Sequence, residues 1–373
     1  MSQEAQFEVA LSFLPHVGDQ LTKVLVSYCG SAKAVFDTPA AKLMKVPGVG
    51  EKVAKSIRDN GRQALLEADE VLKKASDKNV ELLFYTSPKY PNRLKQLPDA
   101  PPLLYFRGNT DLNHRRIISI VGTRKPTSYG QAVTERIVEE LRPYNVMIVS
   151  GLAYGIDITA HRAALQAGLP TIGVMASGPD TIYPGVHKKY AEKMLEQGGV
   201  ITENTFGTKP DAPRFPARNR IIAGMSDCTI VIEAAFKSGT LITADIAHSY
   251  DKEVMAVPGN INSPMSEGTN WLIKTHKAAV LTSSQDVIEL LNWDVEDDLA
   301  ARRAKSIPAL DPAEFTPDEM QVLQVLIQSG EEQMDNLCWK AQIPVSQLAS
   351  ILLALEFKGM VKALPGKRFA LIR

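Results

Sequence analysis

Cysteine, aromatic residues and net charge are all scarce in this sequence. Only three of the 373 residues are cysteines, and they lie too far apart for a zinc site or a disulfide framework, so we expect a reducing compartment. Aromatic residues make up 6%, which is too few for an extended surface on which bases stack. The 42 basic residues balance the 42 acidic ones, which excludes binding to polyanions through bulk charge but allows a local basic cleft.

Long hydrophobic runs are also missing. No apolar run approaches the ~20 residues needed to span a bilayer, and the first residues, MSQEAQFEVALSF, lack the basic and apolar regions of a signal peptide. We therefore expect a cytoplasmic protein with no membrane partner. The 45% of hydrophobic residues is ordinary for a globular protein, and the length predicts two or three domains.

The central part of the chain reads as an α/β domain. From residue 117 onward, short β-branched runs alternate with helix-length segments. This pattern is typical of a mostly parallel sheet covered by helices on both faces, so we predict a Rossmann-like, doubly wound sheet within residues 79–293. The expected strands are 117–121, 146–149, 171–175, 229–232, 254–257 and 278–281.

Two smaller domains flank this sheet. Residues 1–78 have helical periodicity, and residues 43–57 resemble a helix-hairpin-helix element. Backbone amides at Gly48 and Gly50, with the cation of Lys52, would contact one phosphate there, although such hairpins also serve purely for packing.

At the other end, residues 294–312 are predicted to be a linker. Residues 313–373 have the outline of a winged-helix domain, with three helices and a terminal hairpin. Its third helix, over residues 346–358, is nearly uncharged. This favours docking to a partner or to another copy over reading of a DNA sequence.

Glycines, hydroxyls and cations recur where the predicted strands end, at the edge where open parallel sheets bind ligands. Bare backbone and helix starts at such places suit phosphate groups. Each segment alone is equally an ordinary strand-to-helix turn, but together they predict an anion-binding cleft without a metal or a catalytic residue. The candidate residues are Gly122, Arg124, Lys125, Ser128, Gly151, Gly155, Lys188, Lys189, Arg214, Arg218, Asn219, Arg220, Ser238, Gly239 and Thr240.

Several of these side chains have structural alternatives. Arg218 and Arg220 are each as well explained by an internal ion pair with Glu203 or Glu233. His161 follows Asp157 by one helical turn, which favours a structural contact between them over a general-base pair.

The order of the motifs resembles the DprA family, also called Smf, the DNA-processing proteins of bacterial transformation. The resemblance covers about residues 85–285 and rests on these segments: Ile120–Arg124, Ser150–Asp157, Tyr183–Pro184, Phe215–Gly224, Glu233–Ala234, Ser238–Thr240, Val257–Gly259 and Gly268–Ile273. It implies a non-enzymatic protein without a cofactor that binds and protects single-stranded DNA and loads the RecA recombinase. It also implies a homodimer formed through the Rossmann-like domain, with Arg124 as the leading phosphate contact.

Two positions depart from the family pattern. Thr123 stands where the family commonly has serine, which keeps the hydroxyl. Residues 275–277 replace a usual Gly-Ala pair, so His276 predicts a rebuilt turn if the family's glycine has a positive φ.

Two other functions remain open at this level. The glycine-rich turns also resemble nucleotide-binding phosphoribohydrolases, in which Glu233 would be the acid–base residue acting on a nucleoside monophosphate. Alternatively, the glycines are structural and the chain is a scaffold.

Overall fold

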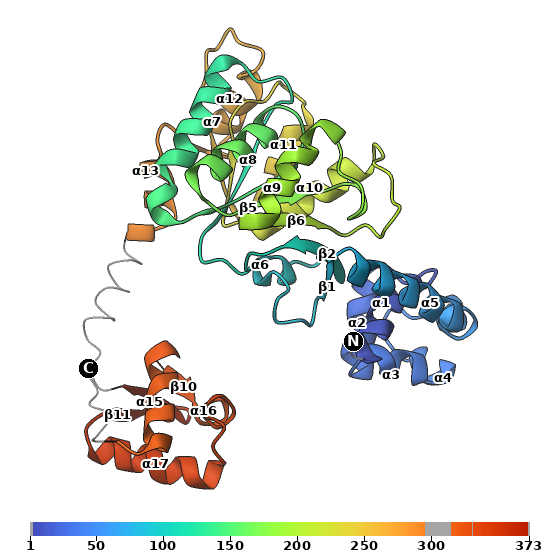
Figure 1. Cartoon of the computed structure of the whole chain (residues 1–373), viewed down its shortest axis with the longest axis vertical. Helices are drawn as coiled ribbons and strands as arrows, with labels where there is room; N and C mark the ends of the chain where they lie inside the picture. The colour runs from blue at the N-terminus through green and yellow to red at the C-terminus, as the bar shows by residue number, and fades with distance from the viewer. Residues whose placement is uncertain (1–2, 295–314, 330, 372–373) are drawn as a thin grey trace. The chain divides into compact units, whose positions relative to one another are not determined.

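The computed structural model describes residues 3–294, 315–329 and 331–371, and the contacts divide the chain into two compact units, residues 1–291 and 292–373 (Figure 1). The first unit begins with helices joined by short turns. In the 27-residue α5, the buried residues recur at three- and four-residue steps and face the other helices. The helices are α1 (Gln3–Leu11), α2 (Asp19–Cys29), α3 (Ala32–Asp37), α4 (Ala40–Leu43) and α5 (Glu51–Asp77).

Two matching turns lead into α2 and α5. Gly18 and Gly50 cap these helices with the same backbone angles, φ −92° and ψ 178°, and each follows a residue with positive φ two positions earlier. The segments Pro15-His16-Val17-Gly18 and Pro47-Gly48-Val49-Gly50 also share a sequence pattern. The predicted hairpin is therefore present, and it is preceded by a second copy that the sequence analysis did not identify.

A nine-stranded sheet forms the centre of the first unit, in the order β1-β2-β6-β5-β4-β3-β7-β8-β9. The β1–β2 and β2–β6 pairs are antiparallel and the other pairs are parallel, which confirms the predicted mostly parallel sheet. The bounds are β1 (Glu81–Phe84), β2 (Leu103–Gly108), β3 (Ile117–Val121), β4 (Met147–Ser150), β5 (Thr171–Val174), β6 (Gly198–Thr202), β7 (Cys228–Val231), β8 (Glu253–Ala256) and β9 (Ala279–Val280).

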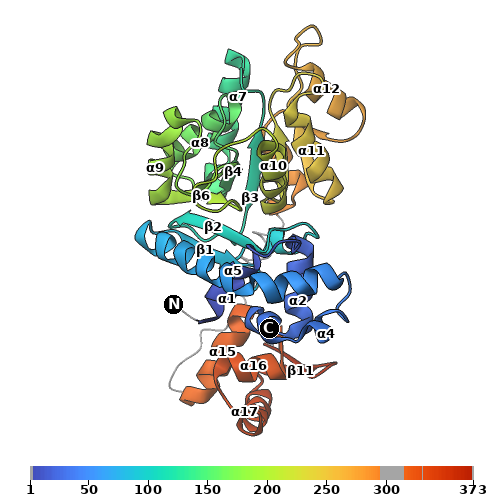
Figure 2. The same ribbon diagram turned by 90° about the vertical axis from the view of Figure 1, so that its right-hand side faces the viewer.

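Helices cover both faces of this sheet. Figure 2 shows α7, α8 and α9 on one side of β3 and β4, and α10 and α11 on the other. The bounds are α6 (Asn92–Lys95), α7 (Ser128–Glu140), α8 (Ile156–Ala167), α9 (Lys188–Gln197), α10 (Arg214–Met225), α11 (Gly239–Ser249), α12 (Glu267–Lys274) and α13 (Ser284–Leu290), with short 3-10 turns at Arg142–Tyr144 and Gly185–His187.

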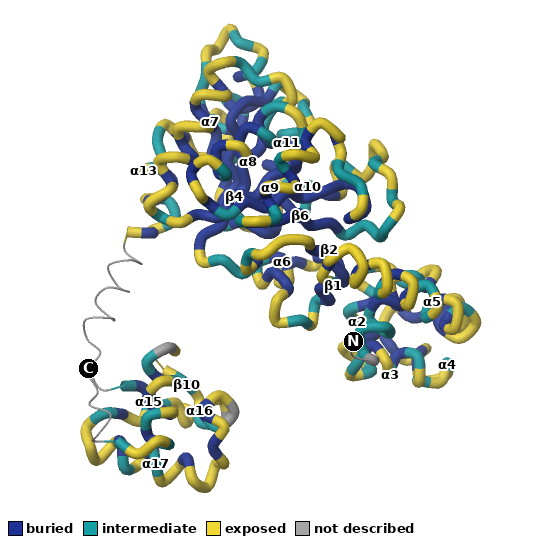
Figure 3. Tube along the Cα trace, in the orientation of Figure 1, coloured by how far each residue is buried: buried dark blue, intermediate teal, exposed yellow. Residues whose placement is uncertain are grey.

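The central strands are buried throughout, and the burial continues into the helical part (Figure 3). Phe84, Leu103 and Tyr105 of β1 and β2 pack in the same apolar core as α1–α5. The predicted boundary at residue 78 therefore falls between α5 and β1, and one continuous core crosses it.

In the turn after α12, a histidine adopts the left-handed backbone conformation that glycine normally favours. His276 itself adopts φ +56°, and the amides of Lys277 and Ala278 both donate to the carbonyl of Leu272. A non-glycine residue in this region is strained by roughly 1–2 kcal/mol.

The second unit has a winged-helix outline with its own core. It contains α15 (Pro317–Ser329), α16 (Met334–Ala341) and α17 (Val345–Phe357), with β10 (Glu331–Gln333), β11 (Val361–Leu364) and β12 (Arg368–Leu371) in the order β10-β12-β11. The strand β10 was not predicted, and the proposed linker lies almost wholly outside the described residues. Among the helices described in either unit, none is long and apolar enough to cross a bilayer.

Candidate functional site

A cleft opens at the point in the sheet where the strand order reverses. The chain runs outward from β3 to β4 on one side and from β7 to β8 on the other, so the loops after β3 and β7 separate and leave a crevice between them. This cleft has a volume of about 870 Å³. Its walls are the loop after β3 (Gly122–Lys125), the first turns of α10 (Phe215–Asn219) and the start of α11 (Ser238–Thr240).

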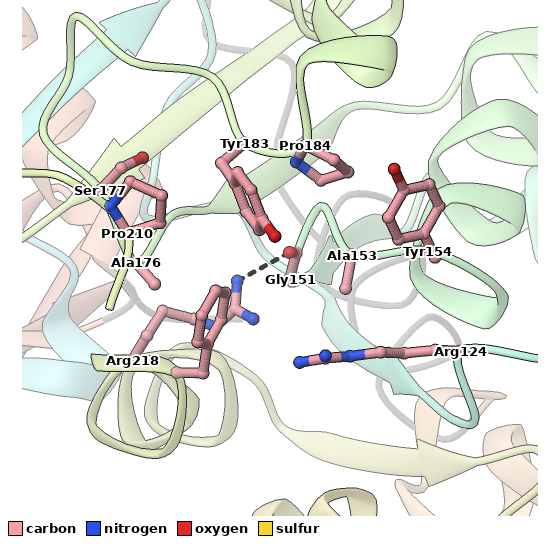
Figure 4. Close-up of a pocket in the computed structure, with 11 residues that line it drawn as sticks. Arg124, Gly151, Ala153, Tyr154, Ala176, Ser177, Tyr183, Pro184, Pro210 and Arg218 are labelled. Atoms are coloured by element: carbon pink, nitrogen blue, oxygen red, sulfur yellow. Dashed lines mark hydrogen bonds between the residues drawn. The ribbon is translucent and has the colours of Figure 1, made fainter. Parts of the chain in front are cut away.

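A narrower pocket continues from this cleft and is lined by aromatic side chains (Figure 4). Its lining includes Tyr154, Tyr183 and Phe215, and the ring centroids of Tyr183 and Phe215 lie 5.9 Å apart. Tyr154 and Tyr183 are each about half exposed. This aromatic pocket was not predicted from the sequence, although all three residues lie within the motifs on which the family resemblance rests.

Arg124 lies at the junction of the cleft and the pocket and lines both. Its guanidinium carbon is 5.4 Å from the centroid of the Phe215 ring, at the distance of a cation–π contact. The side chain is exposed, and it forms no hydrogen bond or ion pair with any described residue. An arginine in this state keeps all its donors available for a phosphate.

Arg218 also lines the cleft, but its donors are engaged by the protein. The side chain is only 5% exposed, and its guanidinium donates to the carbonyl of Gly151 at 2.7 Å (dashed in Figure 4) and to that of Val174. A Cβ on Gly151 would lie 2.6 Å from both this guanidinium and the Asp157 carboxylate, so the two charges meet beneath Gly151. Of the alternatives left open for Arg218, neither Glu203 nor Glu233 is its partner; the carboxylate beside it belongs to Asp157.

Burial dominates the electrostatics of the pair formed by Arg218 and Asp157. It raises the pKa of Asp157, an effect that the Arg218 charge opposes, and it lowers the pKa of Arg218 to about 10. Arg218 therefore supports the floor of the cleft rather than reaching out of it.

Arg220 lies outside the cleft, which corrects its inclusion in the predicted site. Its guanidinium contacts the carboxylate of Glu203, lies 3.3 Å from that of Asp19 in α2, and donates to the carbonyl of Asp99 at 2.6 Å. Residues two apart on a helix point to nearly opposite sides, so Arg218 and Arg220 cannot face the same cleft. The pairing with Glu203, left open by the sequence, is the one that the structure contains.

The other predicted cations are distributed over the surface. Lys125 and Asn219 line the cleft, whereas Lys188 lines a separate cavity. Lys189 and Arg214 are exposed and line none of these cavities, and Arg214 donates to the side chain of Asn204 at 2.8 Å.

Two predicted glycines are needed for packing of the protein against itself. A Cβ on Gly155, which has φ +80°, would lie 2.2 Å from the carbonyl oxygen of Thr123, and one on Gly122 would lie 2.5 Å from the side chain of Ile156. These contacts join the loops after β3 and β4. Gly122 nevertheless lines the cleft, as expected, whereas Gly155 lines none of the cavities described here.

The start of α7 is already occupied by an internal carboxylate. Glu233 accepts hydrogen bonds from the backbone amide of Thr127 at 2.9 Å and from its hydroxyl at 2.5 Å, and the Thr127 hydroxyl accepts from the amide of Gly130. The predicted phosphate site at the start of α7, next to Ser128, is thus filled by the protein. Glu233 is buried and lies outside the lining of the cleft, so it is not placed as an acid–base residue.

The start of α11 is different. Ser238 caps this helix without a side-chain hydrogen bond, and its buried hydroxyl oxygen has no partner among the described residues. Gly239 has open space where a Cβ would be, and Ser238, Gly239 and Thr240 all line the cleft. The amides at this helix start are available to an anion.

His161 is a core residue. Its Nδ1 lies 2.7 Å from the hydroxyl of Thr171, and complete burial lowers its pKa to about 3. The expected contact with Asp157 is not among the hydrogen bonds of the described residues. In the same part of the chain, no group of three or more His, Cys, Asp or Glu residues is placed to hold a metal ion.

The Lys45, Gly48, Gly50 and Lys52 turn is exposed on the helical part. Gly48 has φ +81°, and Gly50 forms the N-cap of α5 without a side-chain hydrogen bond. The matching turn before α2 instead approaches the sheet domain through Asp19 and Arg220.

Family models match all three parts of the chain. The model for DNA recombination-mediator protein A matches residues 81–292, that for the DprA winged helix domain residues 304–367, and that for a helix-hairpin-helix motif residues 6–63. Protein Smf from Synechocystis is 30% identical over 99% of both chains. Protein Smf from Escherichia coli is 36% identical over 77% of this chain and 76% of its own.

Solved structures show the same fold. DNA processing protein A from Streptococcus pneumoniae is 31% identical with a TM-score of 0.66, over 76% of this chain and 97% of its own. The corresponding protein from Helicobacter pylori, reported for its single-stranded DNA binding mode, is 32% identical with a TM-score of 0.53, over 58% of this chain and 96% of its own.

Proposed function

This chain belongs to the DprA/Smf family of DNA-processing proteins, and we propose that its cleft binds single-stranded DNA without chemically altering it. One observation carries the proposal. The exposed guanidinium of Arg124, which has no ion-pair or hydrogen-bond partner among the described residues, lies between an aromatic pocket and the cleft that contains the uncapped start of α11.

Each part of this arrangement suits one part of a nucleotide. Arg124, Lys125 and the backbone amides of Gly239 and Thr240 supply positive charge and donors for the sugar-phosphate backbone. The Tyr183 and Phe215 rings offer faces against which a flat, apolar base can stack. A base enters such a pocket only when it is unpaired, which favours single strands over duplexes.

The arrangement of the carboxylates argues against the phosphoribohydrolase alternative. Glu233, the acid–base residue of that alternative, is engaged with Thr127 and lies outside the lining of the cleft. Asp157 lines the cleft, but it is buried beside the Arg218 guanidinium.

The proposal extends to the partners expected for this family, namely a second copy of the chain and the RecA recombinase. An exposed aromatic side chain near the start of α11 supports a homodimer: Phe236 is half exposed and packs against Trp271. Loading of RecA is the role we infer for the bound strand within DNA processing.

The binding proposal is tested by titrating the full chain with single- and double-stranded DNA of equal length at two salt concentrations. We expect tighter binding to the single strand, with an affinity that falls as salt rises. Arg124→Ala should reduce the salt slope by about 0.7, the value for one phosphate contact on a single strand, and Arg124→Glu should weaken binding at least about tenfold.

Lys73→Glu provides the matched control, because it makes the same change in net charge at an exposed position of α5 outside the cleft. Unchanged affinity of Arg124→Glu, or equal effects of the two charge reversals, would remove Arg124 from the site.

A further inference from the structure

A second cavity lies beside the aromatic pocket and uses parts of the chain that the proposed function does not. It has a volume of about 480 Å³ and is built between the end of α5, strand β2 and one face of α9, and we name it the α5–α9 groove. Figure 2 shows α9, β6, β2 and α5 following one another in space. The lining residues are Lys78, Arg107, Pro179–Ile182, Lys188, Ala191, Glu192, Leu195 and Val200.

Cations from three separate elements converge on this groove. Lys78 comes from the end of α5, Arg107 from β2 and Lys188 from the start of α9. Arg107 is exposed, and its guanidinium has no ion pair or hydrogen bond within the described part of the chain. Its donors are therefore available to a ligand.

The two carboxylates of the groove, Asp180 and Glu192, repel an anion only weakly. Lys78 lies 4.0 Å from Asp180 and Lys188 lies 4.0 Å from Glu192, and both lysines are more than half exposed. Pairs of this kind stabilise a protein little, so either lysine can exchange its carboxylate for a phosphate. Both oxygens of Asp180 also accept from the amide of Gly207, which partly neutralises that carboxylate.

The groove also contains apolar residues. Ile182, Leu195 and Val200 are among its lining residues. A free inorganic anion would leave these side chains uncovered, whereas a nucleotide has an apolar base to cover them and a phosphate for the cations.

The groove and the aromatic pocket share one loop. Tyr183 and Pro184 line the pocket, while residues 179–182 just before them and Lys188 just after them line the groove. A strand that leaves the pocket across this loop enters the groove that Lys188 and Arg107 line. This continuity favours the same strand as the occupant over a separate peptide.

We propose that the α5–α9 groove holds the continuation of the single strand whose base occupies the aromatic pocket. Arg107, Lys188 and Lys78 contact its phosphates, and its bases cover Leu195 and Val200. The inference rests on the proposed function of the cleft, and it assigns the helical N-terminal part a role in binding long strands.

Strand length separates the two sites. Fluorescence anisotropy of the full chain is measured with oligothymidylates of about four and about sixteen nucleotides, the range of site sizes common among single-strand binders. Arg107→Glu should weaken binding of the long strand by about tenfold and reduce its salt slope, but leave the affinity for the short strand unchanged. Lys73→Glu, on the helix whose C-cap is Lys78 but outside the groove, should change neither affinity.

The possible results distinguish this inference from the function on which it rests. If Arg107→Glu binds the long strand as tightly as the unaltered chain does, or loses affinity for both lengths equally, the groove is not on the strand's path. If the unaltered chain binds neither oligonucleotide, the proposed function of the cleft fails first. Thermal melting of Arg107→Glu confirms that the comparison is made on folded protein, because Arg107 is exposed and its replacement leaves no buried group unpaired.

Discussion

Replacing Arg218 by methionine tests whether this arginine supports the cleft or contacts DNA. Arg218→Met replaces a buried guanidinium side chain by an apolar side chain of similar volume. It leaves the Asp157 carboxylate without its neighbouring cation, and the carbonyls of Gly151 and Val174 without this donor. Leaving a buried charge without the opposite charge beside it costs up to about 3–5 kcal/mol, because the remaining charge stays in a desolvated site. We expect a loss of about 4 kcal/mol in the free energy of unfolding at pH 7.

The second variant removes the stranded charge. Asp157→Asn in the Arg218→Met background keeps an oxygen that can accept from the amide of Ala153, which lies 3.4 Å from the carboxylate, but carries no charge. We expect the double variant to recover about 2 kcal/mol of the loss, since only the missing hydrogen bonds remain. Chemical denaturation of the two variants and of the unaltered chain measures both differences.

The pH dependence has a definite sign. Burial already raises the pKa of Asp157, and without Arg218 the pKa rises further. A carboxylate whose folded pKa lies above its unfolded value destabilises the protein once the pH exceeds the unfolded value, so the deficit of Arg218→Met should shrink as the pH falls. Equal losses in the single and double variants, or a deficit that does not change with pH, would refute the buried-pair argument.

DNA binding by the same variant separates the two roles. A supporting Arg218 predicts weaker binding of Arg218→Met with an unchanged salt slope, because no phosphate contact is lost. A slope reduced by about 0.7 would instead make Arg218 a phosphate contact, as the sequence analysis proposed.

Two further predictions concern stability. His276→Gly should raise the free energy of unfolding by up to about 1 kcal/mol, because glycine relieves the strain at φ +56°. The gain is smaller than the strain, since a glycine loses more conformational entropy on folding. A destabilised variant in chemical denaturation would contradict this. Burial raises the pKa of Glu203 to about 6, above its unfolded value near 4.5. The folded state therefore binds this proton more tightly than the unfolded chain does, and the resulting stability is lost as the pH rises from 4.5 through 6. Relative to Glu203→Gln, the unaltered chain should therefore lose up to about 2 kcal/mol between pH 4.5 and 6, and parallel pH profiles would be inconsistent with this shift.

The fold could be predicted where strands are continuous apolar runs. The predicted segments near residues 117–121, 146–149 and 171–175 became β3, β4 and β5, and those near 229–232, 254–257 and 278–281 became β7, β8 and β9. Strand β6 was missed because it begins with Gly198-Gly199, which reads as a turn. The structure needs glycine there because a Cβ on Gly198 would lie 2.0 Å from the carbonyl oxygen of Thr171 in β5.

The candidate site could be predicted only as a set of loops. Because the ends of parallel strands share one edge, Arg124 after β3 and Ser238 after β7 could be expected to meet, and both line the cleft. The direction of each arginine on α10 could not be predicted, since it depends on the rotation of that helix against the sheet. The same limit applies to Glu233, whose partner, Thr127, lies 106 residues away.

The distribution of internal carboxylates explains how a chain with no net charge can form a site for an anion. Glu233 fills the start of α7, and Asp157, in the first turn of α8, lies beside Arg218. These acids neutralise a helix start and a buried cation inside the protein, so neither faces the cleft as an isolated charge. The start of α11 and the guanidinium of Arg124 have no such partner among the described residues, and they therefore determine the potential that a ligand meets. Positive potential in this fold depends on which groups remain unpaired at one edge of the sheet, and total charge does not reveal it.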